Sequence, residues 1–210
     1  IAGGSVRVEN CVISGWAANG VNFDVTGQAP GKGPTQLFMK DTTVRGIGGG
    51  AGVSIKGDKG SVSATIDHCQ LENNRVGLLA SAGSRATIRD SIAAGNTSAG
   101  FLADGDTVEL NLENCIATIN ETGLQAGMGA TMRVSNTTIT SNARGLLGGA
   151  GGKLLTYGNN KLAGNGDDGA FDGMVEGPNN GGKITGVTAG AGLTGGGSSG
   201  DVTLSVAASG

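Results

Sequence analysis

The 210-residue sequence contains few aromatic residues, and this limits the kind of core that it can build. Phe, Trp and Tyr make up 3% of the chain, whereas hydrophobic residues of all kinds make up 37%. Proline is also scarce, with 3 residues, and there is a single histidine. Any core must therefore be built mainly from Val, Ile, Leu and Ala.

Strong charge and long apolar runs are missing as well. The net charge is −3 and no basic stretch stands out, which argues against a nucleic-acid partner and against an anionic membrane surface. No apolar run approaches ~18 residues, so the sequence predicts no membrane span. The chain opens on "IAGGSVRV", which looks like one repeat running into the next. We therefore expect it to be a piece of a longer protein, and the lack of a signal peptide is uninformative about export.

Glycine is abundant, with 43 residues, but it follows no G-X-Y period, which excludes collagen. Instead the sequence repeats itself: "ENCIATINETGLQAG" aligns with "SNTTITSNARGLLGG". The alignment extends over the chain as a turn column of Asn10, Asp41, His68, Asp90, Asn114, Asn136 and Asn159, spaced by 31, 27, 22, 24, 22 and 23 residues. Six residues after each of these lie Trp16, Ile47, Asn74, Asn96, Asn120, Asn142 and Asn165.

The repeat indicates strands and turns. Apolar residues alternate in short runs bounded by Gly, Asn and Asp, and this much glycine is incompatible with a helical repeat. A period of 22 to 24 residues holds three short strands and three turns, which is one coil of a parallel β-helix. We predict an all-β, right-handed parallel β-helix of about seven coils over residues 1–172.

The columns have physical roles in such a coil. The turn column holds the residues that best tolerate positive φ. Asn74, Asn96, Asn120, Asn142 and Asn165 are predicted to form a ladder of side-chain amides that hydrogen-bond from coil to coil. A glycine column follows, suited to positive φ or to close approach of backbones.

The three cysteines, Cys11, Cys69 and Cys115, fall in one column on alternate coils. Neighbours in this column would lie ~9.6 Å apart, at two coils of ~4.8 Å each. That distance exceeds the ~7 Å limit on Cα separation for a disulfide. We predict three reduced, inward-facing thiols that act as small hydrophobic residues.

The segments "VRVENCVISGWAANGVNF" and "VELNLENCIATINETGLQA" resemble repeats of the right-handed parallel β-helix proteins, the pectate-lyase-like superfamily. They are most similar to bacterial exported β-helix proteins of unassigned function. The resemblance is specific for fold and weak for function, because members include lyases, hydrolases, epimerases, phage tailspikes and plain surface proteins.

After Asp172 the pattern stops, and residues 173–182 have the composition of a linker. Residues 183–210 form a Gly-rich, β-prone tail that is too small to bury a core of its own. Its segment "ITGVTAGAGLTGGGSSGDVTLSV" resembles one found in phage tail fibres and bacterial surface-protein stalks. We expect the tail either to join chains into a homotrimer or to cap the last coil.

Catalytic and metal-binding candidates are weighed against structural roles. Asp67, Arg89 and Glu113 lie on successive coils of one outward face and form either an acid–base constellation or a ladder of alternating charges. Asp104 and Asp106 lie in a loop that could bind a cation weakly or be a solvated turn. No nucleophile is paired with His68, so triad chemistry is not expected. If these residues form a ladder of charges, we expect no catalytic residue, cofactor or metal. If they form a lyase-like site, we expect that site to bind Ca²⁺.

Two functions remain open. The first is a non-enzymatic extracellular module, structural, adhesive or fibre-forming, that presents a rigid rod at a cell surface or on a virion. The second is a carbohydrate-active enzyme of the polysaccharide lyase or hydrolase class, or a tailspike-like receptor-binding protein, with a polysaccharide as its ligand.

Overall fold

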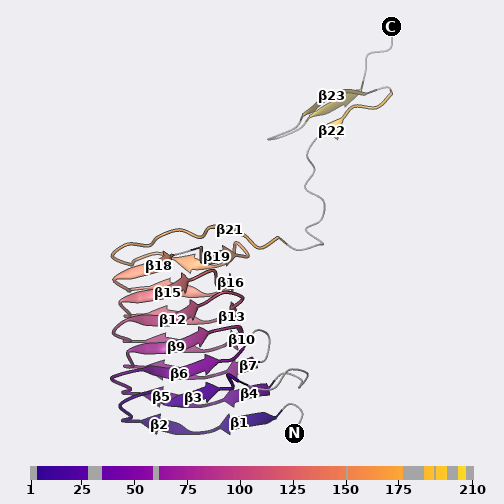
Figure 1. The fold of residues 1–210 in the computed structure, drawn as a ribbon. Coiled ribbons are helices and arrows are strands. Elements are labelled where there is room, and N and C mark those ends of the chain that lie inside the picture. Colours follow the sequence, from indigo (N-terminus) through magenta and orange to yellow (C-terminus); the bar gives the residue numbers. More distant parts are fainter. Residues whose placement is uncertain are drawn as a thin grey trace. The chain divides into compact units, whose positions relative to one another are not determined.

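The computed structural model describes residues 4–27, 35–58, 62–149, 151–176, 187–191, 193–197 and 203–206. The chain divides into two compact units, Ile1–Val175 and Glu176–Gly210. The first is a solenoid of parallel strands that wind in successive coils (Figure 1). No described segment forms a helix that is long and apolar enough to cross a membrane.

Three parallel sheets, here called A, B and C, run along the solenoid. Sheet A contains β1 (Ser5–Glu9), β4 (Thr35–Lys40), β7 (Val62–Asp67), β10 (Ser84–Arg89), β13 (Glu109–Glu113), β16 (Thr131–Ser135), β19 (Lys153–Thr156) and β21 (Gly173–Met174). Sheet B contains β2 (Val12–Ser14), β5 (Thr43–Arg45), β8 (Gln70–Glu72), β11 (Ile92–Ala94), β14 (Ile116–Thr118), β17 (Thr138–Thr140) and β20 (Lys161–Leu162). Sheet C contains β3 (Val21–Asp24), β6 (Ala51–Lys56), β9 (Val76–Ser81), β12 (Ala99–Asp104), β15 (Thr122–Gly127) and β18 (Arg144–Gly148).

This topology confirms the predicted all-β parallel β-helix. Each strand pairs in parallel with the strand one repeat away, as in β10 beside β7 and β13. The coil count differs slightly from the predicted seven. Six coils contribute to all three sheets, a seventh contributes β19 and β20, and β21 adds one last strand. We number the coils from the N-terminus, so coil 5 holds β13, β14 and β15.

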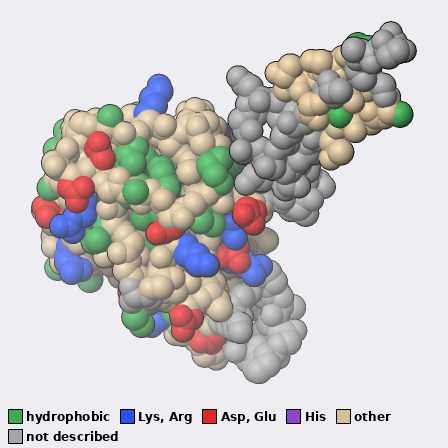
Figure 2. Space-filling view, turned by 90° about the horizontal axis from the view of Figure 1, so that it is seen from above, with side chains coloured by type: hydrophobic (Ala, Val, Ile, Leu, Met, Phe, Trp, Pro, Cys, Tyr) green, Lys and Arg blue, Asp and Glu red, His purple; other side chains and the backbone are tan. Residues whose placement is uncertain are grey.

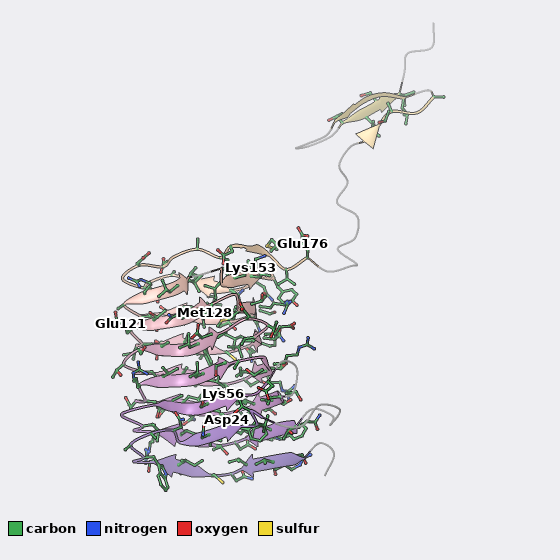
Figure 3. The ribbon with its side chains drawn as sticks, in the orientation of Figure 1. Asp24, Lys56, Glu121, Met128, Lys153 and Glu176 are labelled. Atoms are coloured by element: carbon green, nitrogen blue, oxygen red, sulfur yellow. The ribbon has the colours of Figure 1, made fainter. Side chains whose placement is uncertain are left out.

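The interior is filled by inward-facing apolar rows, of which sheets A and C each contribute two and sheet B one. In sheet A, Met39, Ile66, Ile88 and Leu112 stack in register and are buried. Phe101 is the largest of the fully buried side chains, so the core depends on branched aliphatic residues, as the composition predicts. Ion pairs between coils lie outside this core; Lys56 Nζ is 3.8 Å from Asp24 Oδ2 on the coil before it (Figure 3).

Sharp turns join the sheets at residues with left-handed backbone. Six members of the turn column, from Asn10 to Asn136, have φ between 47° and 54°, and on the last coil Gly158 takes this conformation in place of Asn159. A second left-handed column, which the sequence comparison did not identify, lies directly before the asparagine ladder. Its members are Gly15, Gly46, Asn73, Gly95, Ile119, Ser141 and Gly164.

The side-chain amides of the asparagine ladder bond to one another from Asn96 to Asn165, and Asn74 joins the ladder through its backbone N–H, which donates to Asn96 Oδ1 at 3.0 Å. Asn96 Nδ2 donates to Asn120 Oδ1 at 2.8 Å, and Asn120 Nδ2 donates to Asn142 Oδ1 at 3.0 Å. Asn142 Nδ2 in turn donates to Asn165 Oδ1 at 2.9 Å. The glycine column packs against it: a Cβ on Gly100 would lie 2.9 Å from Asn120 Nδ2 and 2.8 Å from the next coil's carbonyl oxygen. Glycine is thus required there for close approach between coils.

The cysteine column alternates with hydroxyl residues. Cys69 N donates to Ser91 Oγ at 3.0 Å, and Cys115 N donates to Thr137 Oγ1 at 3.3 Å. All three cysteines are free; Cys69 and Cys115 are buried, whereas Cys11 on the first coil is partly exposed. The first coil leaves other positions open as well, since Trp16 is 63% exposed where Ile47 and Asn74 of the same column are buried. Trp16 is left uncovered because no described coil lies on the outer side of coil 1.

The second unit, described by itself, contains three antiparallel strands: β22 (Val187–Thr188), β23 (Leu193–Gly197) and β24 (Leu204–Val206). Leu193, Leu204 and Val206 are exposed on it. Most of the expected linker, residues 177–182, and the start of the tail, residues 183–186, lie outside the described residues.

Candidate functional site

The strongest cluster of charged side chains lies where sheet A turns into sheet B. Asp67 and Arg89 end β7 and β10, and the register of the two strands places them side by side. Arg89 donates through Nε to Asp67 Oδ1 at 3.0 Å and through Nη2 to Asp67 Oδ2 at 3.3 Å. His68 Nδ1 lies 2.7 Å from Asp67 Oδ1. One carboxylate therefore serves both a guanidinium and an imidazole.

These contacts favour the charged forms of both Asp67 and Arg89. Burial raises the pKa of Asp67, but the hydrogen bonds from Arg89 and His68 outweigh it and hold that pKa below its usual value. The hydrogen bond to Asp67 and its negative charge raise the pKa of Arg89. A catalytic arginine base needs the opposite shift, toward the neutral guanidine, so this geometry favours a structural ion pair.

The rest of the predicted constellation is not assembled around this pair. Glu113 stands beside Arg89 in the register of sheet A, yet within the described residues it has no ion pair at 4.0 Å or less. The predicted ladder of alternating charges is not complete either. Lys40 contacts Asp41 of its own coil at 4.0 Å, and Glu9 contacts Arg7 of its own strand at 3.4 Å. Long side chains pair within a coil here as readily as between coils.

One group of side chains has the composition of a metal site. Ligand atoms of Asp67, His68 and Asp90 all lie within 4.8 Å of one another, the only such group of three among the described residues. Both oxygens of Asp67 are engaged by Arg89, whose Nε also lies 3.8 Å from Asp90 Oδ2. A cation would have to displace or tolerate this guanidinium, so the fit to calcium or another divalent ion is poor.

Asp104 and Asp106 lie at the turn from sheet C to sheet A. Asp104 ends β12, and its Oδ1 sits 2.8 Å from where a Cβ on Gly127 would be. Asp106 Oδ1 lies 2.5 Å from the corresponding position on Gly129. Each carboxylate thus covers a glycine of the next coil, and Asp106 borders a shallow depression of about 340 Å³ that also involves Asp58 and Thr107. The two are not brought together as a three-ligand site.

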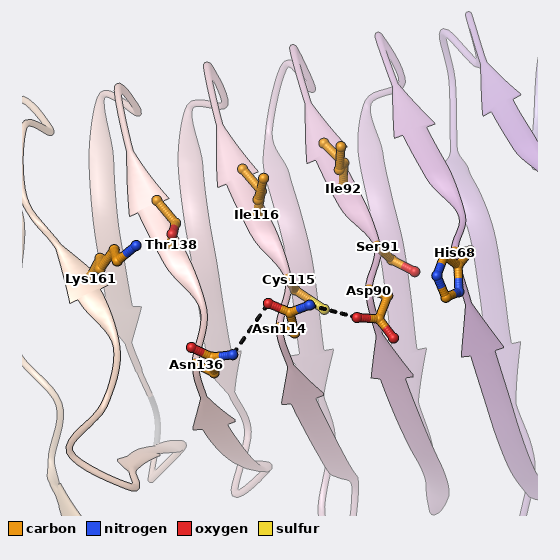
Figure 4. Close-up of a pocket in the computed structure, with 10 residues that line it drawn as sticks. All are labelled: His68, Asp90, Ser91, Ile92, Asn114, Cys115, Ile116, Asn136, Thr138 and Lys161. Atoms are coloured by element: carbon orange, nitrogen blue, oxygen red, sulfur yellow. Dashed lines mark hydrogen bonds between the residues drawn. The ribbon is translucent and has the colours of Figure 1, made fainter.

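A groove of about 390 Å³ runs across several coils beside the charged cluster (Figure 4). One side is the turn column, where Asn114 Nδ2 donates to Asp90 Oδ1 at 2.6 Å and Asn136 Nδ2 donates to Asn114 Oδ1 at 3.3 Å. The other side consists of outward residues of sheet B, including Ile92 and Ile116. The turn column is therefore a second, exposed polar ladder. The regular Asn and Asp content of the turn column is the feature of the sequence that could have predicted this ladder. From the sequence, we explain that content by left-handed backbone alone.

A protein-family model described as a right-handed β-helix region matches residues 1–167 of the chain. Searches of the curated proteins and of the solved structures found no match. The family match covers the coils that carry the ladders, the charged cluster and the groove.

Proposed function

The chain belongs to the right-handed β-helix family, and from that premise we propose that it is a rigid, non-enzymatic rod module of an extracellular or surface protein. The family and the fold support a rod-like module. The core and both ladders give it stiffness, because every coil is tied to the next by backbone pairing and coils 3 to 7 are also tied by side-chain amides.

The engagement of Asp67 by Arg89 and His68 is the observation that carries this proposal. Acid–base chemistry on a polysaccharide needs a carboxylate free to hold a cation or a proton, and a base able to lose its proton. Asp67 has its oxygens occupied, and Arg89 is stabilised in the charged form. Figure 2 shows, on the face seen from above, acidic and basic side chains interspersed, which offers no single-sign surface for a polyuronate there.

A depolymerisation assay tests the proposal against the lyase alternative. The full chain would be incubated with pectate, alginate and a neutral glucan, with and without Ca²⁺, and unsaturated or reducing ends would be measured. Arg89→Ala and Asp67→Ala are the diagnostic variants, and Lys153→Ala, on an exposed part of sheet A, is the matched control. We expect no turnover by any of the four proteins. Turnover that Arg89→Ala abolishes and Lys153→Ala retains would refute the non-enzymatic function.

The second unit supports a role in assembly, and we propose that it joins three copies. Its β strands leave Leu193, Leu204 and Val206 exposed, so these apolar side chains would become buried by packing against a partner. Light scattering on the full chain and on a version ending at Gly182 tests this. A trimer that becomes monomeric on truncation is expected, whereas a monomer in both cases would favour a capping role.

A further inference from the structure

The outer face of sheet B is uncharged over three consecutive coils. In β11, β14 and β17 the middle residue is buried and the flanking residues point outward. The outward residues are Ile92, Ala94, Ile116, Thr118, Thr138 and Thr140, and we call them the β11–β17 face. Sheet B carries charge only beyond this face, at Arg45 and Glu72 on one side and Lys161 on the other.

Ile119 adds an exposed and strained side chain at the edge of this face, on its middle coil. It follows β14, is 66% exposed and has φ of 56°. Other coils place Gly, Asn or Ser at this position, which are residues that tolerate left-handed backbone or are small. A β-branched residue there is unfavourable both for the backbone and for exposure to water. Ile116, which starts β14 on the same coil, is 39% exposed. Ile119 thus departs from the usual residue preferences in two ways, in its backbone conformation and in its exposure to water. Such departures without a structural benefit point to a surface selected for binding.

We propose that the β11–β17 face binds the same face of a second copy, with the two solenoids antiparallel and a twofold axis along β14. Coil 5 then lies on coil 5 of the other copy, so Ile116 and Ile119 meet their own counterparts and become buried. Sheets that pack face to face lie ~10 Å apart, a distance that aliphatic and Thr side chains fill.

Charge complementarity selects this arrangement. Coil 3 and coil 7 lie equally far from coil 5, so the twofold axis brings Lys161 of one copy opposite Gln70 of the other, because the two residues share one row of sheet B. Glu72 points outward two residues further along β8, a distance of ~7 Å that the lysine side chain can span. Within the described residues neither Glu72 nor Lys161 has an ion pair at 4.0 Å or less. Within one chain they are four coils apart, or ~19 Å, and cannot pair with each other. Arg45 lies one coil farther out and faces no strand of the other copy's sheet B.

The size of the face sets the expected strength. Strands of three residues and a span of five coils give roughly 10 by 24 Å. An interface of this size falls below the ~1,200 Å² of stable complexes, so the dimer is weak and forms at high local concentration. The inference does not depend on whether the module is catalytic or on the trimer.

Sedimentation equilibrium of the full chain over a wide concentration range tests the proposal. The average mass of the wild type should rise with concentration, above the value set by any association through the tail. Ile119→Asn should weaken this association at least tenfold and raise the thermal midpoint, because Asn73 shows that Asn is accepted in this column at φ 54°. If Ile119 had only a structural role, its replacement would not weaken association while raising the thermal midpoint.

Charge exchange tests the antiparallel arrangement. Glu72→Lys and Lys161→Glu should each weaken association, and the double exchange should restore it, while Lys153→Glu on sheet A should leave it unchanged. A mass independent of concentration in the wild type, an unchanged association in Ile119→Asn, or failure of the double exchange to restore it would overturn the proposal. If the face instead binds a glycan or another protein, the mass of the wild type will be independent of concentration.

Discussion

Replacing Asn120 by Ala should reveal how much the interior ladder contributes to stability. The side chain of Asn120 is buried and makes four hydrogen bonds. Its Oδ1 accepts from Asn96 N at 2.9 Å and from Asn96 Nδ2 at 2.8 Å. Its Nδ2 donates to Ala93 O and to Asn142 Oδ1, both at 3.0 Å. It thus joins three coils.

The cost follows from what the truncation leaves behind. The backbone N–H of Asn96 loses its acceptor in a buried turn, which costs about 1–3 kcal/mol. The amides of Asn96 and Asn142 each lose one partner but keep another, with Leu71 O and with Asn120 N. Adding these smaller losses, we expect the free energy of unfolding to fall by about 2–4 kcal/mol.

Urea unfolding followed by circular dichroism measures this change as a shift of the midpoint at constant slope. Asn111→Ala is the matched control, since Asn111 points outward from sheet A and makes no side-chain hydrogen bond to another described residue. The control should change stability by less than about 0.5 kcal/mol. Equal midpoints for the two variants would refute the idea that the ladder stabilises the stack.

Three further results are expected. Gly100→Ala should lower the free energy of unfolding by about 1–3 kcal/mol, because its Cβ would meet a carbonyl and a ladder amide, whereas Gly149→Ala, with nothing within 4 Å, should be nearly neutral in the same urea assay. Burial raises the pKa of Cys69, and it raises that of Cys115 to about 12, so native protein at mildly alkaline pH should protect both from alkylation until it unfolds; rapid labelling would contradict this. Asp67 has a depressed pKa when folded, so its stabilisation is present above the unfolded pKa and lost as pH falls through the folded one. Thermal midpoints of Asp67→Asn should therefore fall less on acidification than those of the wild type, and parallel curves would contradict the pairing.

Much of the fold was readable because its determinants recur in register. The position of Asn120 in a column with Asn96 and Asn142 predicted a ladder, and the structure contains it. Steric demands at the sharp turns likewise limit the residue types to a few, so the left-handed backbone of Asn114 follows from its column. Repetition turns one ambiguous residue into seven comparable ones.

The surface was harder to read because it lacks this repetition. Arg89 pairs with Asp67 and not with Glu113, a choice between two neighbours that depends on rotamers and on the turn residue His68. The exposure of Ile119 was missed since its column mixes Gly, Asn, Ser and Ile, and no single residue type marks it. Sequence columns report what every coil must share, while candidate sites lie where one coil departs from the others.

The stacking of equivalent coils also determines how the length of this molecule can change. The hydrogen-bonding pattern that one coil presents upward is the pattern that the next accepts, so a whole period of 22 to 24 residues could be duplicated or lost with both ladders still in register. Each such event would lengthen or shorten the rod by ~4.8 Å without altering its cross-section. Partial periods would break both ladders at once. Proteins that descend from this sequence are thus expected to differ in solenoid length by whole coils.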